Sequence, residues 1–141
     1  MIEQWSKMRA QLTLHEGRRK FPYVDTVGQT TIGVGWNLTA NGLPDEIIDR
    51  LLDISIGNAW SDLQKALPWT SKLDPVRQRV LWDMAFNLGI AGLLAFHDTL
   101  LAVENGRYEQ AAYRMLQSKW AGQVGRRAVT LAQMMRTGQD G

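Results

Sequence analysis

A short Gly-rich stretch near the N-terminus interrupts a chain that otherwise has helical spacing almost throughout. The stretch fits a strand over residues 21–26, a turn at Val27-Gly28 and a returning strand over residues 29–35. We therefore predict a mostly helical α+β protein whose β structure is one small hairpin.

Helical patterns lie on both sides of this hairpin. Before it, Trp5, Met8 and Leu12 recur at the spacing of one helix face, and Gly17 stands where a helix C-cap is expected. After it, Pro44 and two acidic residues open a long helix that runs to about residue 67, where Pro68 stops it.

The C-terminal half is predicted to be helical as well. Asp74-Pro75 opens a helix that runs to Gly89, and its inward face is predicted to carry Val76, Val80, Leu81, Met84 and Phe86. Residues 84–96 carry no charge, but a membrane span needs about twenty apolar residues, so we assign them to the core. Shorter helices are predicted over residues 98–104 with Asp98 as N-cap, 108–117 and 126–135, with breaks at Asn105-Gly106 and Gly122.

The length of 141 residues, with 45% hydrophobic residues, suits one compact domain with its own core. We expect a β-hairpin lobe over about residues 17–43 and a connecting helix over about residues 44–67. A helical lobe would follow over about residues 68–141, joined by the N-terminal helix. Aromatic residues favour the core, so we expect most of the six tryptophans to be buried.

Three polar residues on this framework indicate chemistry. Glu16 closes the first helical stretch, Asp25 follows it by nine positions and Thr31 follows Asp25 by six. A helix end that runs straight into a tight turn can bring two acids to opposite walls of a cleft, and paired carboxylates are what glycoside hydrolysis needs. The negative end of the helix dipole also disfavours a charged carboxylate at Glu16, which suits a general acid. Taken singly, the three residues also fit a solvated acid, a turn residue and a strand former.

An ordered set of short segments resembles the phage lysozyme family typified by the T-even phage enzyme, which is glycoside hydrolase family 24. The matching segments are His15-Glu16-Gly17, Tyr23-Val24-Asp25-Thr26, Thr31-Ile32-Gly33-Val34-Gly35, Asn87-Leu88-Gly89, Ser118-Lys119-Trp120 and Arg126-Arg127-Ala128. The resemblance implies a lysozyme-like two-lobe domain. It also implies hydrolysis of the β-1,4 bond between N-acetylmuramic acid and N-acetylglucosamine in bacterial peptidoglycan.

The resemblance also implies the role of each catalytic residue. Glu16 would protonate the glycosidic oxygen, Asp25 would stabilise positive charge on the sugar and help hold the attacking water, and Thr31 would position that water. The outcome in the family is inversion at the anomeric carbon.

Further residues are candidates for substrate contact or support. Gly35, Trp36 and Asn37 follow the hairpin, and Asn87 ends a helix that the family turns toward substrate, although Asn87 fits a helix-capping role equally well. Arg127 matches a family arginine directed at the catalytic glutamate, and a solvated basic helix face is the alternative. Trp36 replaces a histidine common in the family. Only seven residues separate Trp36 from Pro44, so we expect the small lobe to lack an extra strand and helix.

No metal or organic cofactor is implied. The chain has no cysteine, and its two histidines, His15 and His97, have no metal-ligand spacing. His97 fits a polar residue at a helix boundary. The resemblance implies peptidoglycan as partner, and we expect a monomer without membrane insertion.

Charge is spread unevenly, with five basic and three acidic groups in residues 1–36, five and eight in 37–100, and six and three in 101–141. Basic ends favour approach to an anionic cell envelope. Basic and aromatic residues are not interleaved as in a single-strand binder, which argues against nucleic acid.

No apolar run follows Met1, so we expect no secretory signal. The expected location is the host cytoplasm before release, with action on the wall in the periplasm. A holin-made hole or carriage on a phage tail would give access to the wall.

Two other readings remain open. A lytic transglycosylase would use the same glutamate and release anhydromuramic ends, and a catalytically silent peptidoglycan-binding module would bind without cutting.

Overall fold

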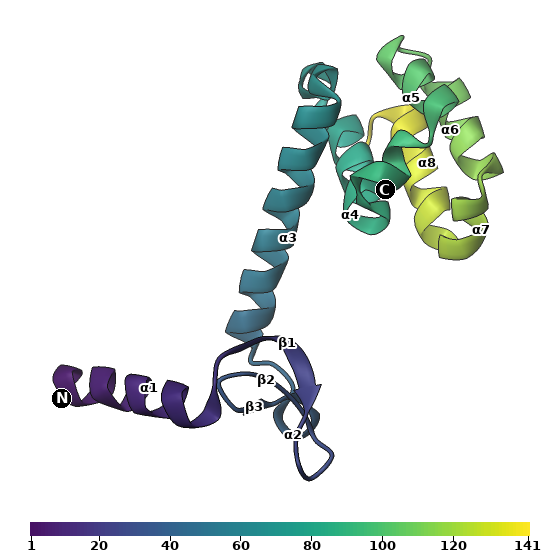
Figure 1. Cartoon of the computed structure of the whole chain (residues 1–141). Helices are drawn as coiled ribbons and strands as arrows, with labels where there is room; N and C mark the ends of the chain where they lie inside the picture. The colour runs from purple at the N-terminus through teal and green to yellow at the C-terminus, as the bar shows by residue number, and fades with distance from the viewer. The chain divides into compact units, whose positions relative to one another are not determined.

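The computed structural model describes all residues 1–141, and the chain divides into two compact units, Met1–Arg50 and Leu51–Gly141 (Figure 1). The first unit contains one long helix, a small sheet, a single helical turn and the beginning of a second long helix. These elements are α1 (Ile2–Glu16), β1 (Arg19–Val24), β2 (Thr30–Gly33), β3 (Trp36–Asn37), α2 (Leu38–Asn41) and the start of α3 (Asp45–Ala66).

The end of α1 agrees with the sequence prediction. Glu16 is the last helical residue and Gly17 is the C-cap, with a φ of 76° and an N–H that donates to the Thr13 carbonyl. A positive φ is a conformation that glycine adopts without steric cost. The chain therefore turns out of the helix directly after Glu16.

The β structure is a three-stranded antiparallel sheet in the order β1-β2-β3, not a simple hairpin. The returning strand ends at Gly33 because Gly33 and Gly35 both have positive φ, 68° and 67°. This geometry turns the chain so that Trp36 pairs with Ile32. Residues Trp36–Asn41 thus form a short strand and one helical turn, so the prediction that the small lobe lacks an extra strand and helix is wrong.

The second unit is helical and contains the whole apolar core. After the remainder of α3 come a 3₁₀ turn and five helices, which are η1 (Pro68–Lys72), α4 (Pro75–Leu94), α5 (His97–Glu104), α6 (Tyr108–Gln117), α7 (Lys119–Val124) and α8 (Arg126–Thr137). Helix α6 packs against α5, α7 and α8, and α8 also packs against α4. The fully buried side chains of the core include Leu63, Leu81, Met84, Leu93, Met115 and Met135.

Helix α4 begins as predicted. Asp74 is its N-cap and accepts from the Arg77 N–H at 3.1 Å, while Pro75 occupies the first turn. Gly89 interrupts the helix with φ 74° and ψ 160°, after which helical geometry resumes as far as Leu94. Phe86, which the pattern assigned to the inward face, is 46% exposed, because the opposite side of α4 supplies the core residues.

Two boundary predictions in the C-terminal part are wrong. Asp98 is not an N-cap, since Phe96 precedes α5 in that position and Asp98 lies in the first turn. Gly122 does not break a helix, because it lies inside α7, and the break falls at Gly125 with its φ of 59°. His97 does begin a helix, as expected.

The tryptophans are less buried than expected. Trp120 is 4% exposed, whereas Trp5 is 68% exposed. Trp60 and Trp82 are half-buried and lie against each other with ring centroids 4.7 Å apart.

No single helix is both long enough and apolar enough to cross a membrane. Only α4 and α5 taken together, bent by 107°, reach that length and composition.

Candidate active site

Glu16 lies at the exposed end of α1, beside the β2–β3 turn. A methyl group on Gly35 would lie 3.0 Å from the Glu16 Oε2 atom, so the carboxyl group rests close to the backbone of that turn. The Glu16 side chain is exposed within the first unit. The helix end therefore delivers an accessible carboxyl group to the edge of the sheet.

Asp25 is held by the hairpin turn through one carboxylate oxygen. Its Oδ1 accepts from the Val27 N–H at 3.0 Å and from the Gln29 N–H at 2.8 Å. Such side-chain bonds to nearby backbone are typical of an aspartate in a turn. They leave Oδ2 without a hydrogen bond from the chain and available to another group.

Thr31 is the most buried residue of the first unit and is 4% exposed. It lies opposite Tyr23 in the β1–β2 ladder, and its hydroxyl donates to the Gln29 carbonyl at 3.2 Å. The hydroxyl hydrogen is therefore engaged, while the oxygen lone pairs remain free to accept. A water molecule at Thr31 would be held as a donor to Oγ1.

Gln29 joins these two residues, although no feature of the sequence singled it out. Its N–H donates to the Asp25 carboxylate, and its carbonyl accepts from the Asp25 N–H at 2.9 Å and from the Thr31 hydroxyl. Asp25 pairs with Gln29 just beyond the strand ends, and Tyr23, two positions before Asp25, faces Thr31 in the ladder, so Asp25 and Thr31 lie on one face of the hairpin. The links use backbone atoms, so the identity of the Gln29 side chain carried no signal.

Trp36 and Asn37 both have structural partners. The Trp36 indole N–H donates to the Gly42 carbonyl at 2.7 Å. The Asn37 Oδ1 accepts from the Ala40 N–H at 2.9 Å and caps α2. The Asn37 amide nitrogen donates to the Gln29 Oε1 at 3.5 Å. The ring face of Trp36 and the second amide hydrogen of Asn37 remain for a substrate.

Asn87 belongs to the second unit and is exposed on α4. Its Oδ1 accepts from the indole N–H of Trp120 at 2.7 Å, so it does not cap the helix with that atom. Trp120 in turn lines a pocket of about 460 Å³ between the start of α5 and the α6–α7 turn, together with Phe96, Tyr113 and Arg114. This bond orients the Asn87 amide and leaves its nitrogen free to donate.

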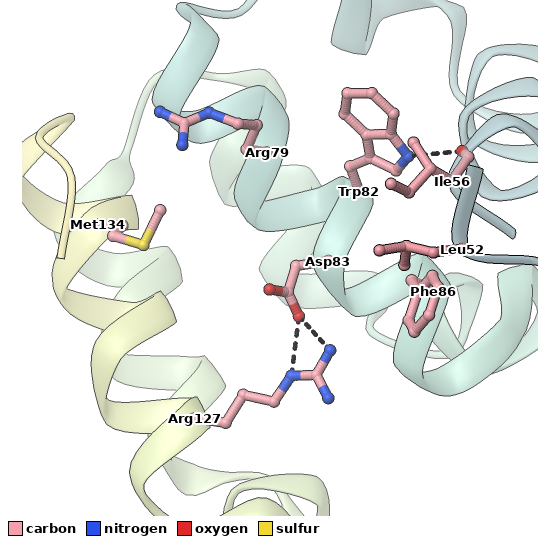
Figure 2. A pocket seen from close by; sticks show the side chains of 8 residues that line it. All are labelled: Leu52, Ile56, Arg79, Trp82, Asp83, Phe86, Arg127 and Met134. Atoms are coloured by element: carbon pink, nitrogen blue, oxygen red, sulfur yellow. Dashed lines mark hydrogen bonds and ion pairs between the residues drawn. The ribbon is translucent and has the colours of Figure 1, made fainter. Parts of the chain in front are cut away.

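Arg127 also lies in the second unit, where α8 faces α4. Figure 2 shows its guanidinium pointing toward Asp83, whose Oδ1 accepts from Nε at 2.9 Å and from Nη2 at 2.6 Å. Both side chains are a little over one-third exposed. The sequence did not single out Asp83, because 44 positions separate it from Arg127 and no local pattern links them.

Asp83 and Arg127 line a pocket of about 520 Å³, whose other walls are mainly apolar and come from α3, α4 and α8 (Figure 2). The lining includes Leu52, Ile56, Trp82, Phe86 and Met134. The Trp82 indole N–H donates to the Ile56 carbonyl at 3.0 Å and ties α4 to α3.

Comparison with known proteins decides which family this arrangement represents. The sequence model of the family described as phage lysozyme matches residues 13–136. The chain belongs to the phage lysozyme family. The matched span takes in Glu16, Asp25, Thr31, Asn87 and Arg127.

Individual relatives are consistent with this assignment. Two probable T4-type lysozymes of Dictyostelium discoideum are each 24% identical to this phage lysozyme, over 94% of its chain and 95% of theirs. The pre-baseplate central spike protein Gp5 of Enterobacteria phage T4 is 28% identical over 93% of this chain, which spans only 28% of the length of Gp5.

The family assignment makes the protein a glycoside hydrolase of the lysozyme type, which implies peptidoglycan as its substrate. No three of its His, Asp and Glu side chains gather where they could hold a metal ion. In the first unit, the Glu16 carboxyl group, the Asp25 Oδ2 and the Thr31 hydroxyl oxygen accept no hydrogen bond from the chain.

Proposed function

We propose that this phage lysozyme cleaves the β-1,4 bond between N-acetylmuramic acid and N-acetylglucosamine by inversion, with Glu16 as general acid. The observation that carries the proposal is the arrangement of the hairpin. Asp25 and Thr31 lie on one face of it, linked through Gln29, and the helix that leads into the same sheet ends at Glu16.

The bond-breaking step needs a proton on the leaving oxygen. The Glu16 carboxyl group would donate that proton as the bond from the anomeric carbon to the oxygen breaks, which leaves positive charge on the sugar ring. Its exposure at the helix end supports access to a polymeric substrate. The unpaired Oδ2 of Asp25 would then face the developing charge.

The bond-forming step needs water on the opposite face of the sugar. In an inverting enzyme the second carboxylate activates this water, and the two carboxyl groups stand roughly 6.5–9.5 Å apart, against about 5–5.5 Å in a retaining enzyme. Thr31 would accept one hydrogen of the water through Oγ1, because its own hydrogen is engaged with Gln29. Asp25 would accept the proton that the water loses as it attacks.

Exchange of Glu16 for glutamine tests the proposal. Glutamine keeps the size of the side chain but is not a proton donor of useful acidity, so we expect Glu16→Gln to clear outer-membrane-permeabilised Gram-negative cells at least about a hundredfold more slowly. Glu3→Gln is the matched control, since Glu3 lies on the same helix in an exposed pair with Lys7. Equal clearing by wild type and Glu16→Gln would contradict the proposal.

The released fragments distinguish the remaining chemistries. Mass spectrometry should find reducing muramic ends, and early proton NMR spectra should show the α-anomer, because inversion of a β-bond gives that product first. Anhydromuramic ends would identify a lytic transglycosylase. Binding to the wall without clearing by the wild type would identify a silent binding module.

A further inference from the structure

Gly35 lies where a side chain would crowd the carboxyl group of the proposed general acid. A Cβ atom at position 35 would stand 3.0 Å from Oε2, 3.2 Å from Cδ and 3.3 Å from Cγ of Glu16. Carbon atoms make their best nonbonded contacts at about 3.5–4.0 Å. Three atoms at the end of the Glu16 side chain would therefore have to shift by a few tenths of an ångström to make room for a Cβ.

The other glycines of the first unit have no such neighbour. Gly28, Gly33 and Gly42 also have positive φ, 83°, 68° and 59°, but nothing would lie within 4 Å of a Cβ at any of them. At Gly17 the nearest atom would be the Arg19 Nε at 3.9 Å. Backbone conformation alone explains glycine at these four positions, whereas Gly35 has an additional steric reason.

We propose that Gly35 is a positioning residue for the catalytic carboxyl group of Glu16. Its missing side chain leaves the space in which the carboxyl group lies against the β2–β3 turn, at the edge of the sheet that carries Asp25 and Thr31. This role rests on the proposed function of Glu16 and differs from a contact between Gly35 and the sugar. A general acid must lie within hydrogen-bond reach of the oxygen that it protonates, so displacement of the carboxyl group slows the chemical step.

Gly35→Ala tests this role through kinetics on soluble uncrosslinked glycan strands. Because a misplacement of about 1 Å can reduce a rate a hundredfold, we expect kcat to fall by about that factor while KM changes little. Gly42→Ala is the matched control, since it carries a similar positive φ without a neighbour, and it should keep kcat close to that of the wild type. An effect on KM alone would assign Gly35 to sugar binding, and an equal kcat for Gly35→Ala and Gly42→Ala would overturn the proposal.

A thermal-stability cycle tests the contact without relying on activity. Gly35→Ala should lower Tm more in the wild type than in a Glu16→Ala background, because the crowding atoms are then absent. Gly42→Ala should lower Tm equally in both backgrounds. If Gly35→Ala is equally damaging, or fails to fold, with and without Glu16, the glycine serves the backbone alone and the proposal is wrong.

The Glu16→Gln activity assay and the stability cycle test the proposed function and the positioning role independently. If Glu16→Gln is as active as the wild type, the proposed function is wrong, yet the stability cycle still reports whether the Glu16 side chain needs the space at Gly35. If Glu16→Gln is inactive and the cycle shows no coupling, only the positioning role is wrong.

Discussion

Thr31 is buried, and its hydroxyl hydrogen is used in a hydrogen bond. It donates to the Gln29 carbonyl, which also accepts from the Asp25 N–H. Loss of the hydroxyl would leave that carbonyl with a partner, so the cost in stability should be small, about 1 kcal/mol. An effect on activity would then report the role of the oxygen as a water acceptor.

We expect Thr31→Val to lower kcat at least tenfold while Tm falls by only a few degrees. Valine has nearly the same shape but cannot accept a hydrogen bond from water. Thr31→Ser restores the acceptor and should recover most of the activity. Steady-state kinetics measures kcat, and thermal melts of the same samples measure Tm.

Thr30→Val is the control for this exchange. Thr30 precedes Thr31 on β2, so its side chain points to the opposite face of the sheet. The activity of the Thr30→Val variant should therefore match that of the wild type. If Thr31→Val is as active as Thr30→Val, Thr31 does not position water.

At the scale of secondary structure, Arg77 connects the start of α4 to two other helices. Its Nη1 pairs with the N-cap residue Asp74 at 3.1 Å, and its guanidinium lies 3.7 Å from the centre of the Tyr108 ring at the start of α6. Its Nε and Nη2 donate to the carbonyls of Met135 and Arg136 at 2.6 and 3.1 Å. The last carbonyls of a helix lack helical partners, so Arg77 satisfies the end of α8.

We predict that Arg77→Ala lowers the free energy of unfolding by about 3 kcal/mol, since it removes charge-assisted hydrogen bonds and a cation–π contact. The side chain is only 15% exposed, so water replaces these partners poorly. Urea denaturation followed by circular dichroism gives the value.

Arg79→Ala provides the comparison two positions along the same helix. Arg79 pairs with Asp140 at 2.6 Å, but the two side chains are 48% and 70% exposed, and exposed pairs contribute about 0–1 kcal/mol. A loss at Arg77 no larger than the loss at Arg79 would show that Arg77 does not hold the three helices together.

The sequence predicted the ends of helices correctly where a single residue, such as a proline or a glycine, sets the local backbone conformation. Proline and acidic residues located the starts of α3 and α4, and Gly17 located the end of α1. Helix α7 was missed because its N-cap Ser118 follows α6 with no loop between them. Strand β3 was missed because two residues are too few to show a period.

At the scale of the whole molecule, the buried apolar side chains are confined to the second unit. Every buried hydrophobic residue lies between Ala59 and Met135, and the first unit, Met1–Arg50, buries only Thr31. Fifty residues without a buried apolar side chain lack the main favourable term of folding. Helix α3 runs without interruption across the boundary between the units.

A unit without its own core depends on the second unit for its stability. We therefore predict that residues 1–141 form one domain that unfolds in a single cooperative transition. The indole N–H signals of Trp36 and Trp120 are suitable NMR probes, because one lies in each unit and each N–H is hydrogen-bonded. Both signals should disappear at the same temperature. Loss of the Trp36 signal well before that of Trp120 would divide the chain into two folding units.

The sequence by itself determined the helices with strong start signals, the presence of a small β element, and Glu16, Asp25 and Thr31 as the catalytic candidates, because spacing, caps and turn residues act locally. Only the tertiary structure decided what each polar group bonds to. It joined Asp25 to Thr31 through the Gln29 backbone, paired Arg127 with Asp83 and set the Glu16 carboxyl group against Gly35. These contacts join residues that are separated along the chain, so no local sequence pattern predicts them.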